Sequence, residues 1–286
     1  MSADLSPADL ALDQALDASR HWAVDMEDLI GSKHLTDQDS DRAAGLLLQI
    51  RTTVVPEFHA CLTLLSHPVE SRAVDVILRS LLEAVVHAAW VAEGEPRGTR
   101  PDSRRCLGTD AEGVFAARRA SCLELGMARA NKSNLDQVNP GSMHQEALDN
   151  ARTWLEQVTQ RHQASGCTGR GRSYKDVAPM LLYWQRRYQL GWPADLWRMT
   201  SGVGHHMTPY RAATISDGQV TWGGPMPLSE RAFQLHRVHT VYANLMQYVV
   251  LAIIPTQVEA FREMTKPSRD LVTLAVTSTV AEVSGT

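Results

Sequence analysis

The strongest constraint on the fold is the segment from Val74 to Val91, which contains no glycine or proline and is almost entirely apolar. Apart from Ser80, the only polar residues in the segment are ionisable ones. With Arg72, just before the segment, they form a regularly spaced row. The row is Arg72, Asp75, Arg79, Glu83 and His87. Separations of three or four residues place these side chains on one side of a helix. A helix that is apolar on its other sides is mostly buried, so residues 69–92 predict a core helix whose polar row is either a solvent-facing edge with an Arg79–Glu83 ion pair or the wall of a pocket.

Helix signals also dominate the rest of the chain. Ser6 and Pro7 form a favourable helix start, and Gly31 is a natural stop. Three further pairs have the three-residue separation of a capping box or a near relative of it. They are Thr109 with Glu112, Ser142 with Gln145, and Ser173 with Asp176. We therefore predict an all-α bundle of about seven to eight helices.

One segment favours strands instead. Residues 212–222 hold two short β-prone runs around Asp217 and Gly218, which accept the positive φ angles of a type I′ turn. This pattern predicts one small β-hairpin.

We expect one helical domain over residues 1–264, followed by a mobile tail over 265–286 that is rich in Thr, Val and Ser. Pro255 should bend the last helix, because proline removes one backbone hydrogen bond. The predicted order of parts is acidic helices 1–92, a basic exposed loop 93–108, helices 109–211, the hairpin 212–222 and a long last helix 229–264.

Charge is distributed unevenly along the chain. Residues 1–96 contain 16 acidic and 6 basic side chains, whereas residues 97–211 contain 10 acidic and 17 basic ones. The basic middle can attract a phosphate backbone or pair with the acidic N-terminal part, and charge alone favours the second. The candidate ligand-binding cations are Arg100, Arg104, Arg105, Arg170 and Arg172.

The sequence favours a cytoplasmic protein. The four cysteines form no C-x-x-C pair and are typical of free thiols in a reducing compartment. The first residues lack the basic and apolar regions of a signal peptide. The most apolar run, residues 245–254, is half the roughly 20 residues that span a bilayer, so we expect no membrane partner.

A second group of candidate functional residues lies in the segment DLWRMTSGVGHH. Arg198 and His205 are seven residues apart, which is two helical turns, with Ser201 between them. Histidine titrates near neutral pH, and arginine offers a permanent planar cation to phosphate oxygens. This pair is suited to phosphate chemistry.

Together, the RSLLEAVVH and WRMTSGVGHH segments resemble a set of uncharacterised actinobacterial all-helical proteins and, more distantly, the HEPN superfamily. The resemblance implies a metal-independent ribonuclease in which Arg198 binds the phosphate and His205 acts on the 2′-hydroxyl or the leaving oxygen. It also implies roles for Arg79, Glu83 and Ser201, an RNA or other phosphate-bearing partner, and a homodimer. No cofactor is expected.

Two other functions remain open. The chain could be a non-catalytic interaction or scaffold protein, since relatives of such families include inactive binding modules. It could also be a metal-dependent helical-bundle enzyme of small-molecule metabolism, because helical bundles bind metals through inward-facing Glu and His residues. The candidate ligands are His205, His206, His236 and His239. Trp184, Trp192 and Trp197 are candidates for base stacking, although aromatic residues in helices more often pack in a core.

Overall fold

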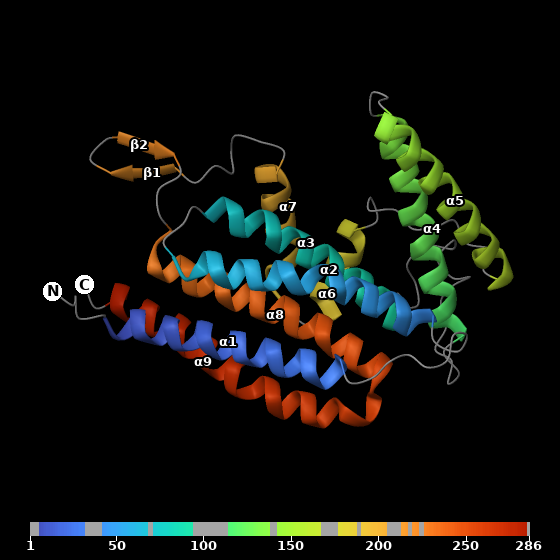
Figure 1. Cartoon of the computed structure of the whole chain (residues 1–286). Helices are drawn as coiled ribbons and strands as arrows, with labels where there is room; N and C mark the ends of the chain where they lie inside the picture. The colour runs from blue at the N-terminus through green and yellow to red at the C-terminus, as the bar shows by residue number, and fades with distance from the viewer. Residues whose placement is uncertain are drawn as a thin grey trace. The chain divides into compact units, whose positions relative to one another are not determined.

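The structure is a computed structural model, and Figure 1 shows its helices and strands. It describes residues 6–31, 42–67, 71–93, 114–137, 142–166, 177–187, 190–204, 213–216, 219–222 and 226–284. The helices are α1 (Pro7–Gly31), α2 (Arg42–Leu65), α3 (Ser71–Glu93), α4 (Val114–Asp136), α5 (Ser142–Ala164), α6 (Val177–Arg187), α7 (Pro193–Gly204), α8 (Leu228–Ile253) and α9 (Val258–Ser284). The prediction of an all-helical class is confirmed. None of the helices in the described ranges combines the length and apolar character needed to cross a bilayer.

A short antiparallel pair of strands lies between α7 and α8. It consists of β1 (Ala213–Ser216) and β2 (Gln219–Trp222), with Ala213 opposite Trp222 and Ser216 opposite Gln219. The two residues expected to form the turn, Asp217 and Gly218, lie outside the described residues.

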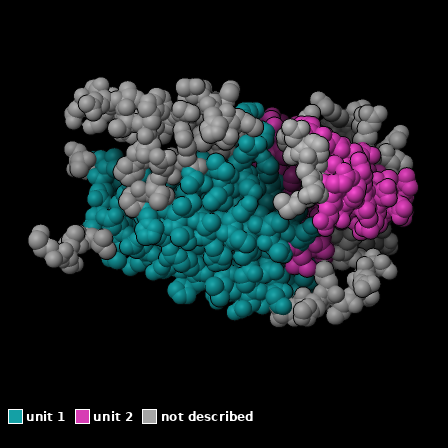
Figure 2. All heavy atoms as spheres, turned by 45° about the horizontal axis from the view of Figure 1, so that its top comes forward, with its two compact units in different colours: residues 1–34, 49–85, 192–286 teal, residues 35–48, 86–191 magenta. Residues whose placement is uncertain are grey.

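The chain divides into two compact units, which Figure 2 colours teal and magenta. Unit 1 comprises residues 1–34, 49–85 and 192–286, and unit 2 comprises residues 35–48 and 86–191. Helices α2 and α3 each contribute residues to both units, so the single helical domain expected over residues 1–264 stays a prediction. Within unit 1, α1, α8 and α9 pack against one another, and within unit 2, α4 packs against α5.

In unit 1, α1 and α9 run antiparallel along each other (Figure 1). Ser6, just before α1, donates a hydrogen bond to Glu282 near the end of α9 (3.2 Å). Further along, the indole N–H of Trp22 donates to the hydroxyl of Thr265 (3.2 Å). These two contacts fix the direction and the register of the pair.

An aromatic cluster joins three helices at the centre of unit 1. Phe58 of α2 and Tyr242 of α8 stack with their ring centroids 3.9 Å apart. Trp22 of α1 meets both rings edge-on, at 6.1 Å from Phe58 and 5.6 Å from Tyr242. Aromatic pairs of this kind contribute about 0.5–1.5 kcal/mol each beyond their buried area.

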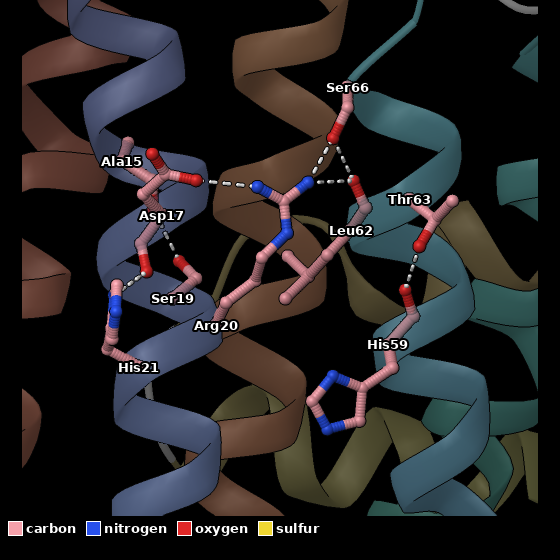
Figure 3. Close-up of polar contacts among 9 residues, drawn as sticks. All are labelled: Ala15, Asp17, Ser19, Arg20, His21, His59, Leu62, Thr63 and Ser66. Carbon is pink, nitrogen blue, oxygen red and sulfur yellow. Dashed lines mark hydrogen bonds and ion pairs between the residues drawn. The ribbon is translucent and has the colours of Figure 1, made fainter.

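Arg20 ties α1 to the end of α2, as Figure 3 shows. Its guanidinium pairs with Asp17 of α1 (2.6 Å) and donates to the carbonyl of Leu62 (3.5 Å) and to the hydroxyl of Ser66. The Leu62 carbonyl, in the last turn of α2, also accepts hydrogen bonds from the N–H and the hydroxyl of Ser66 (3.1 and 2.8 Å). Arg20 therefore stabilises the end of α2 while it holds α1 beside it.

Unit 2 uses an arginine in the same way. Arg119 of α4 is buried and donates from Nε to the carbonyl of Val91 (2.8 Å) and from Nη2 to that of Ala92 (3.1 Å), in the last turn of α3. The α4–α5 core contains Leu125, Ala128 and Val158, with Trp154 and Leu155 packed against it.

The long last helix predicted for 229–264 is instead two helices. Helix α8 ends at Ile253, a 3-10 turn covers Pro255–Gln257, and α9 begins at Val258. Ile254 has φ −137° and ψ 60°, outside the helical region. Proline disfavours helical angles in the residue before it and has no N–H to donate, so Pro255 ends α8 rather than bending it.

The expectation of a mobile tail over 265–286 is wrong, because α9 continues to Ser284. The buried residues of this stretch are separated by three or four positions, the spacing of one helical face. They are Thr265, Ser268, Val272, Ala275 and Thr279. The many hydroxyl groups are also satisfied within the helix, as when Thr265 donates to the carbonyl of Phe261 (2.7 Å). The spacing, rather than the composition, was the informative signal.

Candidate functional site

The polar row of α3 lies partly exposed between buried apolar residues. Asp75, Arg79, Glu83 and His87 are all half-buried in the structure, and the side chain of Arg72 is not described. Between Val74 and Val86, six apolar residues of the same helix are fully buried, whereas Val76, beside Asp75, is 51% exposed. The buried ones are Val74, Leu78, Leu81, Leu82, Val85 and Val86. The apolar positions anchor the helix and fix the direction in which the row points.

Arg79 and Glu83 meet Trp197 of α7. Arg79 Nε and Trp197 Nε1 both donate to Glu83 Oε1, at 3.1 and 3.0 Å. The guanidinium carbon of Arg79 lies 5.6 Å from the centroid of the Trp197 ring, which is a cation–π distance. We call these three residues the α3–α7 site. The RSLLEAVVH and WRMTSGVGHH segments are therefore in contact within unit 1, through Glu83 and Trp197.

The contact runs through a residue for which the sequence favoured a different role. Trp197 was a candidate for base stacking or core packing, and here its N–H orients a carboxylate. The Arg79–Glu83 ion pair is the four-residue pair that the sequence offered as the structural alternative. Both side chains keep about a quarter of their surface exposed, at 23% and 25%. Pairs of this kind contribute about 0.3–0.5 kcal/mol, so the pair orients the groups more than it stabilises the fold.

The remaining predicted catalytic residues fall outside this contact. Arg198 forms an ion pair with Asp195 in its own helix (3.1 Å) and is 55% exposed. Ser201 belongs to α7, but its side chain is not described, and His205 lies outside the described residues. Of the predicted catalytic residues, the structure therefore brings together only Arg79 and Glu83 among those it describes. Arg198 directly follows Trp197 in the chain but pairs with Asp195 instead of Glu83.

Two residues that the sequence did not single out extend the α3–α7 site toward α2. Ser80 donates from its hydroxyl to Glu57 Oε1 (2.9 Å), and Glu57 Oε2 is buried with no hydrogen-bond partner in the described structure. Burial raises the pKa of Glu57, the Ser80 hydrogen bond opposes that rise, and the Glu83 carboxylate adds to it. The available signal was Ser80 itself, a hydroxyl within an apolar helix that needs a partner.

Asp75 of α3, like Glu57, lies close enough to Cys61 of α2 for its carboxylate to affect the Cys61 thiol. Gln234 of α8 donates from Nε2 to Asp75 Oδ1 (2.9 Å). Burial raises the pKa of Asp75 to about 6, against the lowering effect of that hydrogen bond. Burial, followed by the carboxylates of Glu57 and Asp75, raises the pKa of the Cys61 thiol to about 12. Cys61 is therefore a neutral thiol at physiological pH and not a nucleophile.

The histidines proposed as metal ligands have other surroundings. His239 is buried, its Nε2 lies 3.0 Å from the Ser268 hydroxyl, and its ring packs 4.7 Å from that of Trp22. Burial, with His236 and Arg269 nearby, lowers the pKa of His239 to about 3. Burial also lowers the pKa of His236, with Arg237 adding to the effect. His205 and His206 lie outside the described residues, and the described ones contain no group of three or more His, Cys, Asp or Glu placed to hold a metal.

The candidate ligand-binding arginines also fall outside the part of the chain that the structure describes. They are Arg100, Arg104, Arg105, Arg170 and Arg172. Of the four cysteines, Cys61 and Cys122 are buried and not in disulfides, and Cys122 Sγ lies 3.3 Å from His162 Nε2. Cys106 and Cys167 belong to undescribed segments. No protein-family model, curated protein or solved structure shows significant similarity to this chain.

Proposed function

We propose that the chain is a HEPN-like helical protein that binds a phosphate-containing ligand, RNA foremost, at the α3–α7 site. The observation that supports the proposal is the shared contact of Arg79 and Trp197 on Glu83 Oε1. It gathers a guanidinium, a carboxylate and an indole on a half-buried side of unit 1. Guanidinium groups bind phosphate oxygens, and indole rings stack on bases.

Cleavage of the RNA, without a metal, is the catalytic form of this proposal. Arg198, 55% exposed, holds the scissile phosphate after releasing Asp195, and His205 exchanges a proton with the 2′-hydroxyl or the leaving oxygen. Glu83 positions Arg79 and Trp197 rather than reacting itself.

The test is binding and cleavage of a labelled single-stranded RNA, with EDTA present, by the full chain and its variants. We expect Arg198→Ala to weaken binding and His205→Ala to abolish cleavage while RNA is still bound. Arg262→Ala is a matched control, because Arg262 pairs with Glu259 three residues away and is 57% exposed, close to the environment of Arg198. RNA binding that is equal in the Arg198 and Arg262 variants would refute the assignment of Arg198.

A second candidate is a non-catalytic interaction protein. Two arginines that the proposal uses are already ion-paired within their own helices, Arg79 with Glu83 and Arg198 with Asp195, which favours a structural role for these charges. Under this alternative the chain binds no RNA even at low ionic strength. The third candidate, a metal-dependent enzyme, requires a transition metal in protein purified without a His-tag, detectable by elemental analysis.

A homodimer belongs to the same proposal, since HEPN-type sites form across a two-fold axis. Exposed apolar side chains along α9 support it, among them Leu274 and Val280. Sedimentation at micromolar concentration tests this state, and a monomer would remove the support that a dimer gives to the ribonuclease.

A further inference from the structure

Two hydrogen-bonded pairs join α3 to α2 and to α8 in unit 1, Ser80 with Glu57 and Asp75 with Gln234, and the carboxylates of both pairs act on the nearby Cys61 thiol. We call Glu57, Asp75 and Gln234 the acceptor cluster. Gln234 is only 2% exposed, and its amide N–H is the donor to Asp75 Oδ1 (2.9 Å). The Ser80 hydroxyl is the donor to Glu57 Oε1 (2.9 Å).

The cluster has more acceptors than donors. Glu57 Oε2 and Gln234 Oε1 are both buried without a hydrogen-bond partner among the described residues. A buried acceptor that has lost water and gained no donor destabilises the folded state. The deficit would be relieved by a group that brings an O–H or N–H into the cluster.

The charges around the cluster also affect the carboxylates of Glu57 and Asp75. On α2 the Cys61 thiol is affected by the carboxylates of Glu57 and Asp75, and on α3 Glu83, which is paired with Arg79, repels the charge of Glu57. On α8 Glu230 repels the charge of Asp75, and Arg237 attracts it. Burial outweighs all of these, and the pKa values of both Glu57 and Asp75 are raised.

A proton is the ligand that suits this cluster. It requires no cavity, and the described residues contain no group of side chains placed to hold a metal ion. We propose that the acceptor cluster is a proton-binding site: mild acidification protonates Asp75, the new O–H donates to Gln234, and the packing of α3 against α2 and α8 becomes more stable. The proposal does not depend on the proposed function.

The direction of the effect follows from linkage. The pKa of Asp75 is about 6 in the folded chain, against an ordinary value of 3.8. The folded state therefore holds the proton more tightly than the unfolded state does. The stabilising contribution is complete below the ordinary value and is lost as the pH rises through about 6. A shift of roughly two units corresponds to about a 100-fold change in the unfolding equilibrium constant.

The test compares the unfolding equilibrium of the full chain with that of Asp75→Asn between pH 4 and pH 8. The asparagine amide accepts from Gln234 Nε2 and offers its own N–H to Gln234 Oε1, so it mimics the protonated carboxyl. We expect the variant to be more stable at pH 8, by up to about 100-fold in the equilibrium constant, and the advantage to disappear near pH 4. Asp270→Asn, at an exposed position of α9, is the control and should show no such trend.

Comparing variants is necessary because other groups respond to pH in the opposite direction, His239 above all. A second measurement holds even if Asp75→Asn fails to fold: the carboxyl carbon of Asp75 in the unmodified chain should titrate near pH 6 by NMR. Gln234→Leu, which removes the donor, should move that midpoint upward. A midpoint near 4, or a stability difference that does not vary with pH, would overturn the proposal.

Discussion

At the scale of single residues, Glu83 and His239 are polar groups that each have a hydrogen-bond partner in another helix. Glu83 Oε1 accepts two hydrogen bonds, one of them from a helix that is 114 residues away in the sequence. His239 has the opposite character: it is buried, neutral and bonded to a hydroxyl. Both arrangements have consequences that substitutions can measure.

Trp197→Phe keeps most of the aromatic ring and removes the N–H that Glu83 accepts. We expect the free energy of unfolding to fall by about 0.5–1.5 kcal/mol, the usual contribution of one hydrogen bond. Urea denaturation measures this change in the free energy of unfolding. If the N–H orients Glu83 for ligand binding, the affinity for RNA should also fall. Unchanged stability would mean that water satisfies Glu83 equally well.

His239→Gln tests the buried imidazole. The pKa of His239 is about 3 in the folded chain, below its ordinary value of 6.5. The unfolded state therefore binds this proton first, and the stability of the folded chain is lost as the pH falls from 6.5 toward 3, by at most about 1.4 kcal/mol per pH unit. The variant should lose that part of the pH dependence, measured by unfolding at several pH values. The exposed His21→Gln should keep the original slope.

At the scale of elements, α9 shows how a helix that looks weak from its composition can be part of a core. It contains Pro267 and many Thr, Val and Ser residues, yet it packs along both α1 and α8. Its stability comes from burial of one face rather than from helix propensity. Variants at buried and exposed positions of α9 should therefore differ sharply.

Val272→Ala and Val283→Ala make the same change in two environments of α9. Val272 is 1% exposed and Val283 is 66% exposed. We expect the first to lower the free energy of unfolding by about 1.5–3 kcal/mol, because it removes buried methyl groups and leaves a cavity. The second should change it by less than about 0.5 kcal/mol. Equal effects in thermal or urea unfolding would restore the interpretation of this segment as a tail.

At the scale of the whole molecule, the chain divides into two compact units. The acidic and basic stretches are divided between these units. The acidic stretch supplies α1 and much of unit 1, and most of the basic stretch belongs to unit 2. The basic side chains could bind RNA or pair with the acidic part of the chain. The dependence of RNA affinity on salt concentration distinguishes these two roles.

The five candidate arginines should be neutralised together, as Arg100→Gln, Arg104→Gln, Arg105→Gln, Arg170→Gln and Arg172→Gln. If RNA binds there, its affinity in the unmodified chain falls steeply with salt, and the variant flattens the slope by a little under one unit for each phosphate that an arginine no longer neutralises. Filter binding at several salt concentrations measures the slope. A variant with the slope of the unmodified chain would leave the acidic part of the chain as the partner of these arginines.

The sequence alone determined what depends on neighbours along the chain. Capping signals, a proline and the separations of apolar residues predicted the helical class, the start of α1 at Pro7, that of α5 at Ser142, and α3 to within two residues at each end. These features are local, because a helix forms its hydrogen bonds four residues apart and repeats its face every three or four. The same spacing would have revealed α9 had it been weighed above composition.

Only the tertiary structure decided which polar side chains meet. Arg79 and Glu83 could be paired from the sequence because they are four residues apart, whereas Trp197 contacts Glu83 across 114 residues and Gln234 contacts Asp75 across 159. The division into two units was decided in the same way. Such contacts form only where the packing of two helices brings a donor and an acceptor to within about 3 Å of each other. Hydrophobic spacing brings the faces together, but it leaves open which side chain lies opposite which.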